Sequence, residues 1–265
     1  MAPLVTHLVV GERVFAPLQQ FGDEEYGSFL LGCVLVDVHG FSDVDRRTTH
    51  FVGRLEEDGT DAFNKSCTNF LSQLDDLLLR PWRELASAEQ AFVAGYLCHL
   101  AADEDWKQFG WNVLQTLEIP SLADFPVPGE VFLTAFDVLS SEMYVDFPSV
   151  TSALNDVAIP NVLAHVPHEA FQAMWDIAQE HVADGRTPES YFEMLRRLGQ
   201  TDAELQEIIH QHDVYWDDAV SWITDFGGVE PRIHAGVERS LEVIPRLWAW
   251  HERCPLEVSL LSTDC

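Results

Sequence analysis

A histidine and an aspartate one helical turn apart are the most chemically suggestive residues of this chain. His99 and Asp103 are four positions apart in the stretch 95–106, so a helix there places both side chains on one face. An imidazole nitrogen and a carboxylate oxygen arranged in this way can both reach one divalent ion at about 2.0–2.2 Å. Their neighbours are mostly apolar, and a buried polar pair needs hydrogen-bond partners or a metal. The spacing therefore indicates two metal ligands, with a simple helix-stabilising His–Asp pair as the ordinary alternative.

Three earlier residues extend this pair. Asp37 ends the apolar run 29–36, where a carboxylate without a cation is costly. His50 follows a polar turn, and His7 lies on the apolar face of the first predicted helix. Each of the three, taken alone, is more often a satisfied core or loop residue. As a set, the five residues predict a mixed nitrogen and oxygen coordination shell for zinc or another transition metal.

Helical periodicity dominates the elements that must position these residues. Period-2 alternation is scarce, so the pattern predicts an all-α fold, a multi-helix bundle. One helical metal-binding domain is expected over residues 1–254, followed by a loosely held tail over 255–265. Capping boxes are predicted at Ser87/Gln90 and at Thr201/Glu204. The predicted helices cover residues 4–14, 26–38, 61–79, 87–110, 129–144, 168–183, 188–198, 201–224 and 229–252.

The composition narrows the classes of partner. Fifteen basic residues against 44 acidic ones give a formal charge of −29, and only Lys65 and Lys107 are lysines. Such a surface repels nucleic-acid backbones and anionic membranes, so neither nucleic-acid binding nor stable membrane association is expected. A small-molecule substrate is the expected partner.

Cysteine usage and the start of the chain predict a cytoplasmic protein. The five cysteines are widely spaced and form no CxxC pair, and three of them lie in apolar helical stretches where a thiol simply packs. This usage fits a reducing compartment. The first residues carry no basic segment of a secretory signal, and the longest apolar stretch is too short to span a bilayer.

The order of four short motifs resembles the zinc-dependent phospholipase C family, which is related to the P1-type zinc-dependent nucleases. The resemblance covers about the first 110 residues and rests on the order and spacing of the motifs. The motifs are Thr6-His7, Leu31-Gly32-Cys33-Val34-Leu35-Val36-Asp37, Arg47-Thr48-Thr49-His50-Phe51, and Gly95-Tyr96-Leu97-Cys98-His99-Leu100-Ala101-Ala102-Asp103-Glu104.

This resemblance implies an all-helical fold with a metal cluster of one or two zinc ions. The implied ligands are His7, Asp37, His50, His99 and Asp103, with Asp103 suited to bridging two ions. The implied activity is hydrolysis of a phosphoester by metal-activated water. Under this reading Asp37 is a ligand or orients and deprotonates the water. From their position beside the site on the same helix, Glu104 or Asp105 is expected to assist.

The sequence departs from the family after the HxxxD helix. The family takes two histidines and a glutamate from the following segment, but this chain has no histidine between Trp106 and Asn161. An HxxxE pair, His165 and Glu169, appears later, and Pro167 interrupts its helical spacing. The ordinary alternative is a helix N-terminus with His168 and Glu169 in its first turn, where a glutamate is favoured by the dipole.

Three classes of function remain open on the sequence. The leading hypothesis is a metal-dependent hydrolase acting on a phosphoester. The second is a redox enzyme using iron or manganese on the same helical scaffold. The third is a non-catalytic protein with a structural metal site. An open coordination position facing a pocket favours an enzyme, and a closed shell favours a structural role.

Overall fold

The computed structural model describes residues 4–51, 65–119, 124–144, 147–183 and 187–252. Every regular element in this part of the chain is a helix, apart from one isolated antiparallel bridge between Leu78 and Leu163. The all-α prediction is therefore confirmed for the described residues. None of their helices combines the length and apolarity that crossing a membrane requires.

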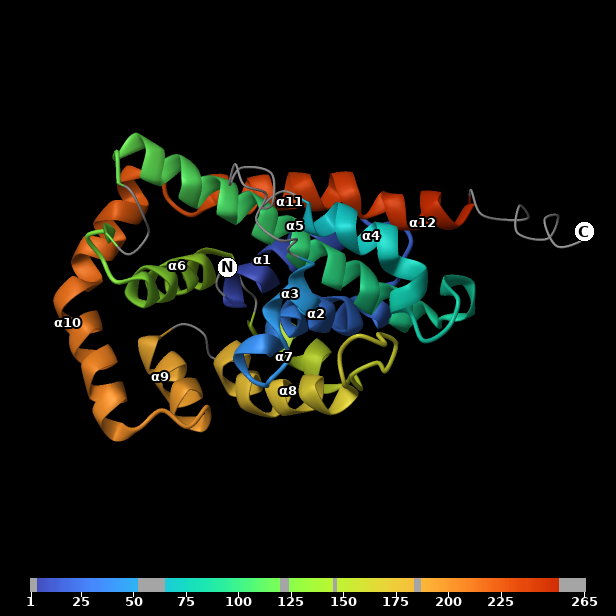
Figure 1. Ribbon diagram of the computed structural model, residues 1–265, viewed down its shortest axis with the longest axis horizontal. Coiled ribbons are helices and arrows are strands. Elements are labelled where there is room, and N and C mark those ends of the chain that lie inside the picture. Colours follow the sequence, from blue (N-terminus) through green and yellow to red (C-terminus); the bar gives the residue numbers. More distant parts are fainter. Residues whose placement is uncertain (1–3, 52–64, 120–123, 145–146, 184–186, 253–265) are drawn as a thin grey trace, which may run out of the picture.

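The long helix α5, Ser87–Thr116, runs across the middle of the molecule (Figure 1). It packs most extensively against α2, Tyr26–Leu35, and then against α11, Glu230–Val243. Helix α1, Leu4–Phe15, contacts all three of these helices. Every residue of α2 from position 27 to 35 is buried, as its almost unbroken apolar sequence requires.

Two glycines allow α2 and α5 to touch backbone to backbone. A Cβ atom on Gly95 would lie 2.0 Å from the carbonyl oxygen of Phe29 in α2. A Cβ atom on Gly32 would lie 2.1 Å from the carbonyl oxygen of Phe92 in α5. Any side chain at either position would push the helices apart, because real Cβ contacts are never this short.

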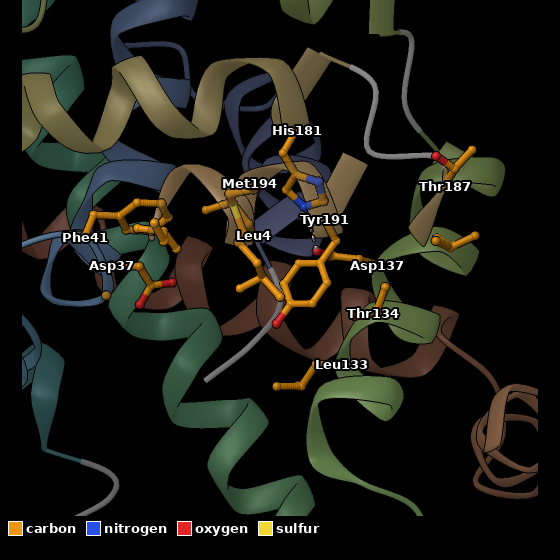
Figure 2. Close-up of a pocket in the computed structure, with 14 residues that line it drawn as sticks. Leu4, Asp37, Phe41, Leu133, Thr134, Asp137, His181, Thr187, Tyr191 and Met194 are labelled. Atoms are coloured by element: carbon orange, nitrogen blue, oxygen red, sulfur yellow. Dashed lines mark ion pairs between the residues drawn. The ribbon is translucent and has the colours of Figure 1, made fainter. Parts of the chain in front are cut away.

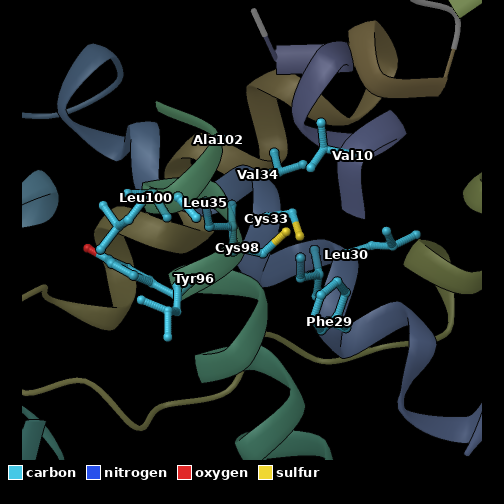
Figure 3. Close-up of a cluster of buried hydrophobic side chains, with 14 of the residues drawn as sticks. Val10, Phe29, Leu30, Cys33, Val34, Leu35, Tyr96, Cys98, Leu100 and Ala102 are labelled. Carbon is cyan, nitrogen blue, oxygen red and sulfur yellow. The ribbon is translucent and has the colours of Figure 1, made fainter. Parts of the chain in front are cut away.

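The core between these helices is closely packed around two thiols. Figure 3 shows Cys33 of α2 and Cys98 of α5 turning their sulfur atoms toward each other, beside Val10 and Leu30. Both thiols are free and fully buried, as is the thiol of Cys67 apart from a trace of exposure. The expectation that three cysteines simply pack in helices is confirmed.

The other elements surround this core. They are η1 Asp23–Glu25, η2 Val36–Gly40, α3 Arg46–His50, α4 Ser66–Leu77, η3 Trp82–Glu84, α6 Gly129–Tyr144, α7 Phe147–Asn155, α8 His168–Ala183, α9 Pro188–Arg197, α10 Asp202–Asp225 and α12 Pro245–Glu252. Helices α9 and α10 lie at the end of the molecule farthest from α4 and α12 (Figure 1).

Several predicted boundaries are corrected by the structure. The helix predicted over 26–38 ends at Leu35 and tightens into the 3₁₀ turn η2, so Asp37 lies in that turn. The helix predicted over 229–252 is two helices, because Pro245 lacks the N–H that would continue the ladder. The predicted Ser87/Gln90 box is one residue late: Glu89 accepts a hydrogen bond from the backbone N–H of Ala86 at 2.8 Å.

The Thr201/Glu204 capping box is confirmed, with the Thr201 hydroxyl and backbone both bonded to Glu204. The start of the helix predicted over 61–79 and the tail predicted over 255–265 lie outside the described residues.

Candidate metal centre

The five residues expected to bind metal come together in one buried cluster, which we call the His/Asp cluster. His7 comes from α1, Asp37 from η2, His50 from the end of α3, and His99 and Asp103 from α5. All five are buried, and Asp37 is the most exposed of them at 6%. Residues separated by 96 positions along the chain therefore meet at one point of the core.

The nitrogen and oxygen atoms of the cluster are spaced like ligands of one ion. Asp37 Oδ1 lies 3.1 Å from His50 Nε2 and 3.7 Å from His99 Nε2. Asp103 lies 3.7 Å from His7 Nε2 through Oδ1 and 3.6 Å from His50 Nε2 through Oδ2. Tetrahedral zinc ligands at about 2.0–2.1 Å from the ion lie about 3.3 Å from one another, so these separations fit a shared cation.

Three overlapping groups of donors could hold an ion. They are His7, Asp37 and His99; His50, His99 and Asp103; and Asp37, His39 and His50. Within each group the candidate ligand atoms lie within 4.8 Å of one another. The third group adds His39, which lies in η2 beside Asp37. Its ring packs edge-on against the His50 ring, with the two ring centroids 5.0 Å apart.

The protonated nitrogen of His99 is fixed by the backbone of α2. His99 Nδ1 lies 2.8 Å from the carbonyl oxygen of Cys33. A carbonyl oxygen can only accept, so Nδ1 carries the proton and Nε2 presents a bare lone pair. Figure 3 shows Cys33 on the α2 face that meets α5, which is the contact created by the two glycines.

A hydroxyl fixes the protonated nitrogen of His50 in the same way. The Thr49 hydroxyl donates its single proton to the carbonyl oxygen of Arg46 at 3.2 Å. It must therefore accept the bond from His50 Nδ1 at 2.8 Å, which leaves His50 Nε2 bare. Tyr96 anchors this turn to α5 by donating a 2.6 Å hydrogen bond to the Thr49 carbonyl oxygen.

These bare nitrogens face carboxylate oxygens, which is repulsive unless a cation lies between them. Within the described part of the chain, no hydrogen-bond partner meets Asp37 Oδ1, His50 Nε2 or His99 Nε2, nor either ring nitrogen of His7. Buried polar atoms are normally satisfied, so a group of buried lone pairs without hydrogen-bond partners suits a cation as their common partner. The residues present fit a divalent metal ion.

The protonation states also suit metal binding. Burial lowers the pKa of His7 and of His99, so both imidazoles are neutral near pH 7. Burial alone would raise the pKa of Asp37, but the positive charge that His99 and His50 carry when protonated, and a hydrogen bond from His50 in that form, hold that pKa below its usual value. The cluster thus offers neutral nitrogens and ionised oxygens, which are the forms that coordinate a metal.

Glu104, expected to assist the chemistry, lies elsewhere. Its carboxylate accepts hydrogen bonds from Arg239 Nη2 at 2.8 Å and from the backbone N–H of Cys67 at 2.9 Å. One residue after Asp103, its side chain points about 100° away around the helix axis. Glu104 therefore joins α5 to α11 and α4 and is not part of the His/Asp cluster, contrary to the sequence-based expectation.

His165 does not join a second metal group in the described part of the chain. Its Nε2 lies 3.4 Å from the hydroxyl of Tyr96, and its ring packs edge-on against Phe51. Glu169 lies in the first turn of α8, the position that favours an acid. The alternative, a helix start with His168 and Glu169 in its first turn, is the arrangement in the structure.

A cavity of about 230 Å³ adjoins the cluster (Figure 2). Asp37 and Phe41 form one part of its wall, and Asp137, His181 and Tyr191 another. The rest of the lining is mostly aliphatic, from Leu4, Leu133, Val138, Met194, Leu195 and Leu198. Asp37 therefore belongs both to the metal cluster and to the wall of a cavity large enough for a small organic group.

Asp137, which the sequence reading did not single out, holds the first turn of α1. Its carboxylate accepts hydrogen bonds from the backbone N–H groups of Val5 at 3.1 Å and Thr6 at 2.8 Å, and from the Thr6 hydroxyl. These are N–H groups of a helix start, which have no partner within the helix. Asp137 thereby fixes the segment that carries His7.

Two cations near the cluster were also missed. Arg46 and Lys107 both contact Asp103. Lys107 could have been found, because it is four residues after Asp103 on the same helix. Asp137 gives the weaker signal of an acid among apolar and small residues of α6, and nothing in the sequence links it to α1.

Comparisons of this chain with family models, with curated proteins and with solved structures gave no match. The resemblance to the zinc-dependent phospholipase C family accordingly stays a prediction drawn from the motifs.

Proposed function

We propose that this chain is a metal-dependent hydrolase that cleaves a phosphoester, with one or two zinc ions held by His7, Asp37, His50, His99 and Asp103. The observation that carries the proposal is the position of Asp37. Its Oδ1 lies 3.1 Å from His50 Nε2 in the cluster, and Asp37 also lines the adjoining cavity. A donor set that borders a cavity favours a catalytic site over a closed structural one.

The roles of the residues follow from their positions. When bound, a zinc ion would supply an acidified water and would polarise a phosphoryl oxygen. His50 and His99 would hold their ring nitrogens toward the ion because Thr49 and Cys33 orient them. Asp37, at the cavity wall, would either serve as a ligand or orient a water and accept its proton. The aliphatic lining would exclude bulk water from one side of the reacting group.

The test combines elemental analysis with two variants. The purified chain should contain zinc, and His99→Ala and Asp103→Asn should each lose most of it. His234→Ala and Asp213→Asn are matched controls, because both residues are exposed and distant in the chain from every ligand. Zinc content that survives both ligand changes would defeat the site assignment.

Activity is measured on chromogenic phosphomonoesters and phosphodiesters with the zinc-loaded chain. We expect hydrolysis that is lost with a chelator, restored by zinc, and absent in both ligand variants. Zinc-loaded protein that hydrolyses none of these esters would refute the hydrolase proposal and leave the structural reading.

A redox metal is the second candidate, favoured by one observation. Each of the three donor groups contains two histidines and one carboxylate, which is also the facial set of non-haem iron enzymes. Because zinc supports no redox turnover, iron or manganese in the purified protein, together with oxygen consumption, would favour this second candidate over the hydrolase.

A further inference from the structure

Two cationic side chains meet at one oxygen of the cluster. Asp103 Oδ2 lies 3.1 Å from Arg46 Nη2 and 3.5 Å from Lys107 Nζ. The chain carries a net charge of −29 and has only two lysines, Lys65 and Lys107. A lysine beside the cluster is therefore an unusual feature of this chain. Lys107 lies beside Asp103, whose carboxylate is also close to His7, His50 and Arg46.

Lys107 is poorly satisfied where it stands. Its side chain is only 10% exposed, and its Nζ has no hydrogen-bond partner within the described residues. Arg46 Nε is likewise buried without a hydrogen-bond partner there, although its side chain is 34% exposed overall. An ammonium has three donors, and removing it from water costs several kcal/mol unless anionic partners compensate. Donors of this kind suit an incoming anion.

The balance of charges in the cluster indicates what charge an incoming anion must carry. Arg46 and Lys107 balance the two carboxylates of the cluster, those of Asp37 and Asp103. A single divalent ion would balance the same two carboxylates by itself. The charges of Arg46 and Lys107 would then be uncompensated in a buried site, where like charges repel strongly. A dianion would restore neutrality.

We propose that Arg46 and Lys107 form a receptor for a terminal, dianionic phosphoryl group, so that the substrate is a phosphomonoester rather than a phosphodiester. This inference rests on the proposed metal-dependent function. The guanidinium of Arg46 can bind two phosphoryl oxygens side by side, and Lys107 adds a point charge from the opposite helix. Arg46 reaches solvent from α3, so it offers the route by which the anion enters.

The receptor also couples metal to phosphate. In the structure both cations contact Asp103. Metal binding to Asp103 would weaken these contacts and release the cations toward the anion. Metal should therefore tighten phosphate binding, and phosphate should tighten metal binding by the same factor.

The experiment is calorimetric titration of the full chain with inorganic phosphate, before and after loading with stoichiometric zinc. Excess zinc is removed first. We expect zinc to tighten phosphate binding at least about tenfold, a coupling in the range of ordinary linked sites. Lys107→Gln and Arg46→Gln should each weaken phosphate binding to the loaded chain about tenfold or more, with zinc content unchanged. Arg246→Gln is the matched control, because that arginine is half exposed in a surface ion pair.

Dimethyl phosphate, a monoanionic diester, is the second probe. It should bind the zinc-loaded chain at least about tenfold more weakly than phosphate, because it leaves one cation uncompensated. Equal binding of the two probes would overturn the inference.

Two other results would overturn it as well. Phosphate affinity that is unchanged in both variants would show that the cations do not receive the anion. A Lys107→Gln chain that binds zinc more tightly and phosphate equally well would make Lys107 a counter-ion of Asp103 only. A chain that binds zinc but fails these tests refutes this inference alone, whereas a chain that binds no zinc refutes it together with the proposed function.

Discussion

At the scale of single residues, the ring nitrogens of His50 and His99 are oriented by groups that never touch the metal. Cys33 supplies a carbonyl oxygen at 2.8 Å, and Thr49 supplies a hydroxyl whose own proton is already committed to Arg46. Each partner restricts its imidazole to the tautomer with the proton on Nδ1. This orientation comes from protein groups alone, so the fold itself aims the two ring nitrogens at a common point.

Thr49→Val tests that orientation. Valine keeps the shape of the side chain and removes the acceptor of the His50 Nδ1 proton. We expect zinc affinity to fall about 10–100-fold, the usual effect of losing a group that orients a ligand. Thr48→Val is the matched control, because Thr48 is exposed in the same helix. Competition with a chromophoric chelator measures the zinc affinity of both variants. Equal affinities in the two variants would contradict the role of Thr49.

Asp137 gives a prediction about pH. Burial raises the pKa of Asp137 to about 7, although the hydrogen bonds from Val5 and Thr6 lower it. An aspartate has a pKa of about 3.9 in the unfolded chain, so the folded state binds more protons between about pH 4 and 7. Asp137 therefore contributes stability that is present at low pH and is lost as the pH rises through this window.

The measurement compares the wild-type chain with Asp137→Asn by urea unfolding from pH 5 to 8. The free energy of unfolding of the wild type should fall relative to the variant by at most about 1.4 kcal/mol per pH unit, and the difference should level off above pH 7. The same comparison with the exposed Asp213→Asn should be flat. A difference for Asp137→Asn that grows in the opposite direction would show that the three hydrogen bonds outweigh burial.

The five cluster residues could be predicted because each leaves a local signal. The i,i+4 spacing of His99 and Asp103, and the cost of Asp37 after an apolar run, are visible in the sequence. Lys107, Arg46 and Asp137 gain their roles only from tertiary contacts. Glu104 was misplaced because adjacency in sequence is not adjacency on a helix face.

At the scale of elements, the contact between α2 and α5 sets the geometry of the site. The two glycines bring the Cys33 carbonyl within 2.8 Å of the His99 ring. The same approach places Asp37, just beyond the end of α2, beside the ligands of α5. A change in helix spacing would therefore act on metal binding as well as on stability.

Gly95→Ala is predicted to lower both the stability of the fold and the affinity for zinc. The new methyl group would meet the Phe29 carbonyl at 2.0 Å and force the helices apart. We expect the free energy of unfolding to fall by about 3 kcal/mol, with a parallel loss of zinc affinity. Gly110→Ala in the same helix is the control, because its Cβ atom would meet nothing within 4 Å. That variant should be neutral or up to about 1 kcal/mol more stable, since alanine favours helix.

Urea unfolding and zinc titration of both variants provide the check. Should Gly95→Ala unfold like Gly110→Ala, the close approach of α2 and α5 would be wrong.

The helices themselves were largely predictable, and the exceptions have physical reasons. Long amphipathic stretches such as α6 and α8 matched their predicted bounds because periodicity and loop prolines mark them clearly. The five-residue helix α3 is too short to show a period, and it is held by Asp45 at its N-cap and by the bond from Tyr96. Such an element depends on its neighbours more than on its own sequence.

At the scale of the whole molecule, the charge of −29 surrounds a cluster that needs cations. Acidic side chains crowd the surface, and their mutual repulsion opposes folding while their field attracts divalent ions. The interior reverses this pattern, because Arg46 and Lys107 stand beside the buried carboxylate of Asp103. The acidic surface would therefore attract the metal ion, and Arg46 and Lys107 would hold an anion.

Added salt should stabilise the fold and weaken zinc binding, because it screens both the surface repulsion and the field that attracts the ion. Raising the ionic strength from about 0.01 M to 1 M shortens the screening length from about 30 Å to about 3 Å. The metal-free chain should gain about 1 kcal/mol or more, seen as a rise of about 2–4 °C in Tm, because surface repulsion is screened. Zinc affinity should fall roughly tenfold, because the attracting field is screened too.

Potassium nitrate is the salt of choice, since chloride binds zinc. Asp103→Asn serves as the control, because it keeps nearly all of the surface charge and loses a ligand. Its Tm should rise with salt as in the wild type, while it binds zinc weakly at every salt concentration. If the Tm of the metal-free chain instead falls with salt, attractive surface ion pairs such as Arg13–Glu230 outweigh the repulsion, and the net charge does not govern stability.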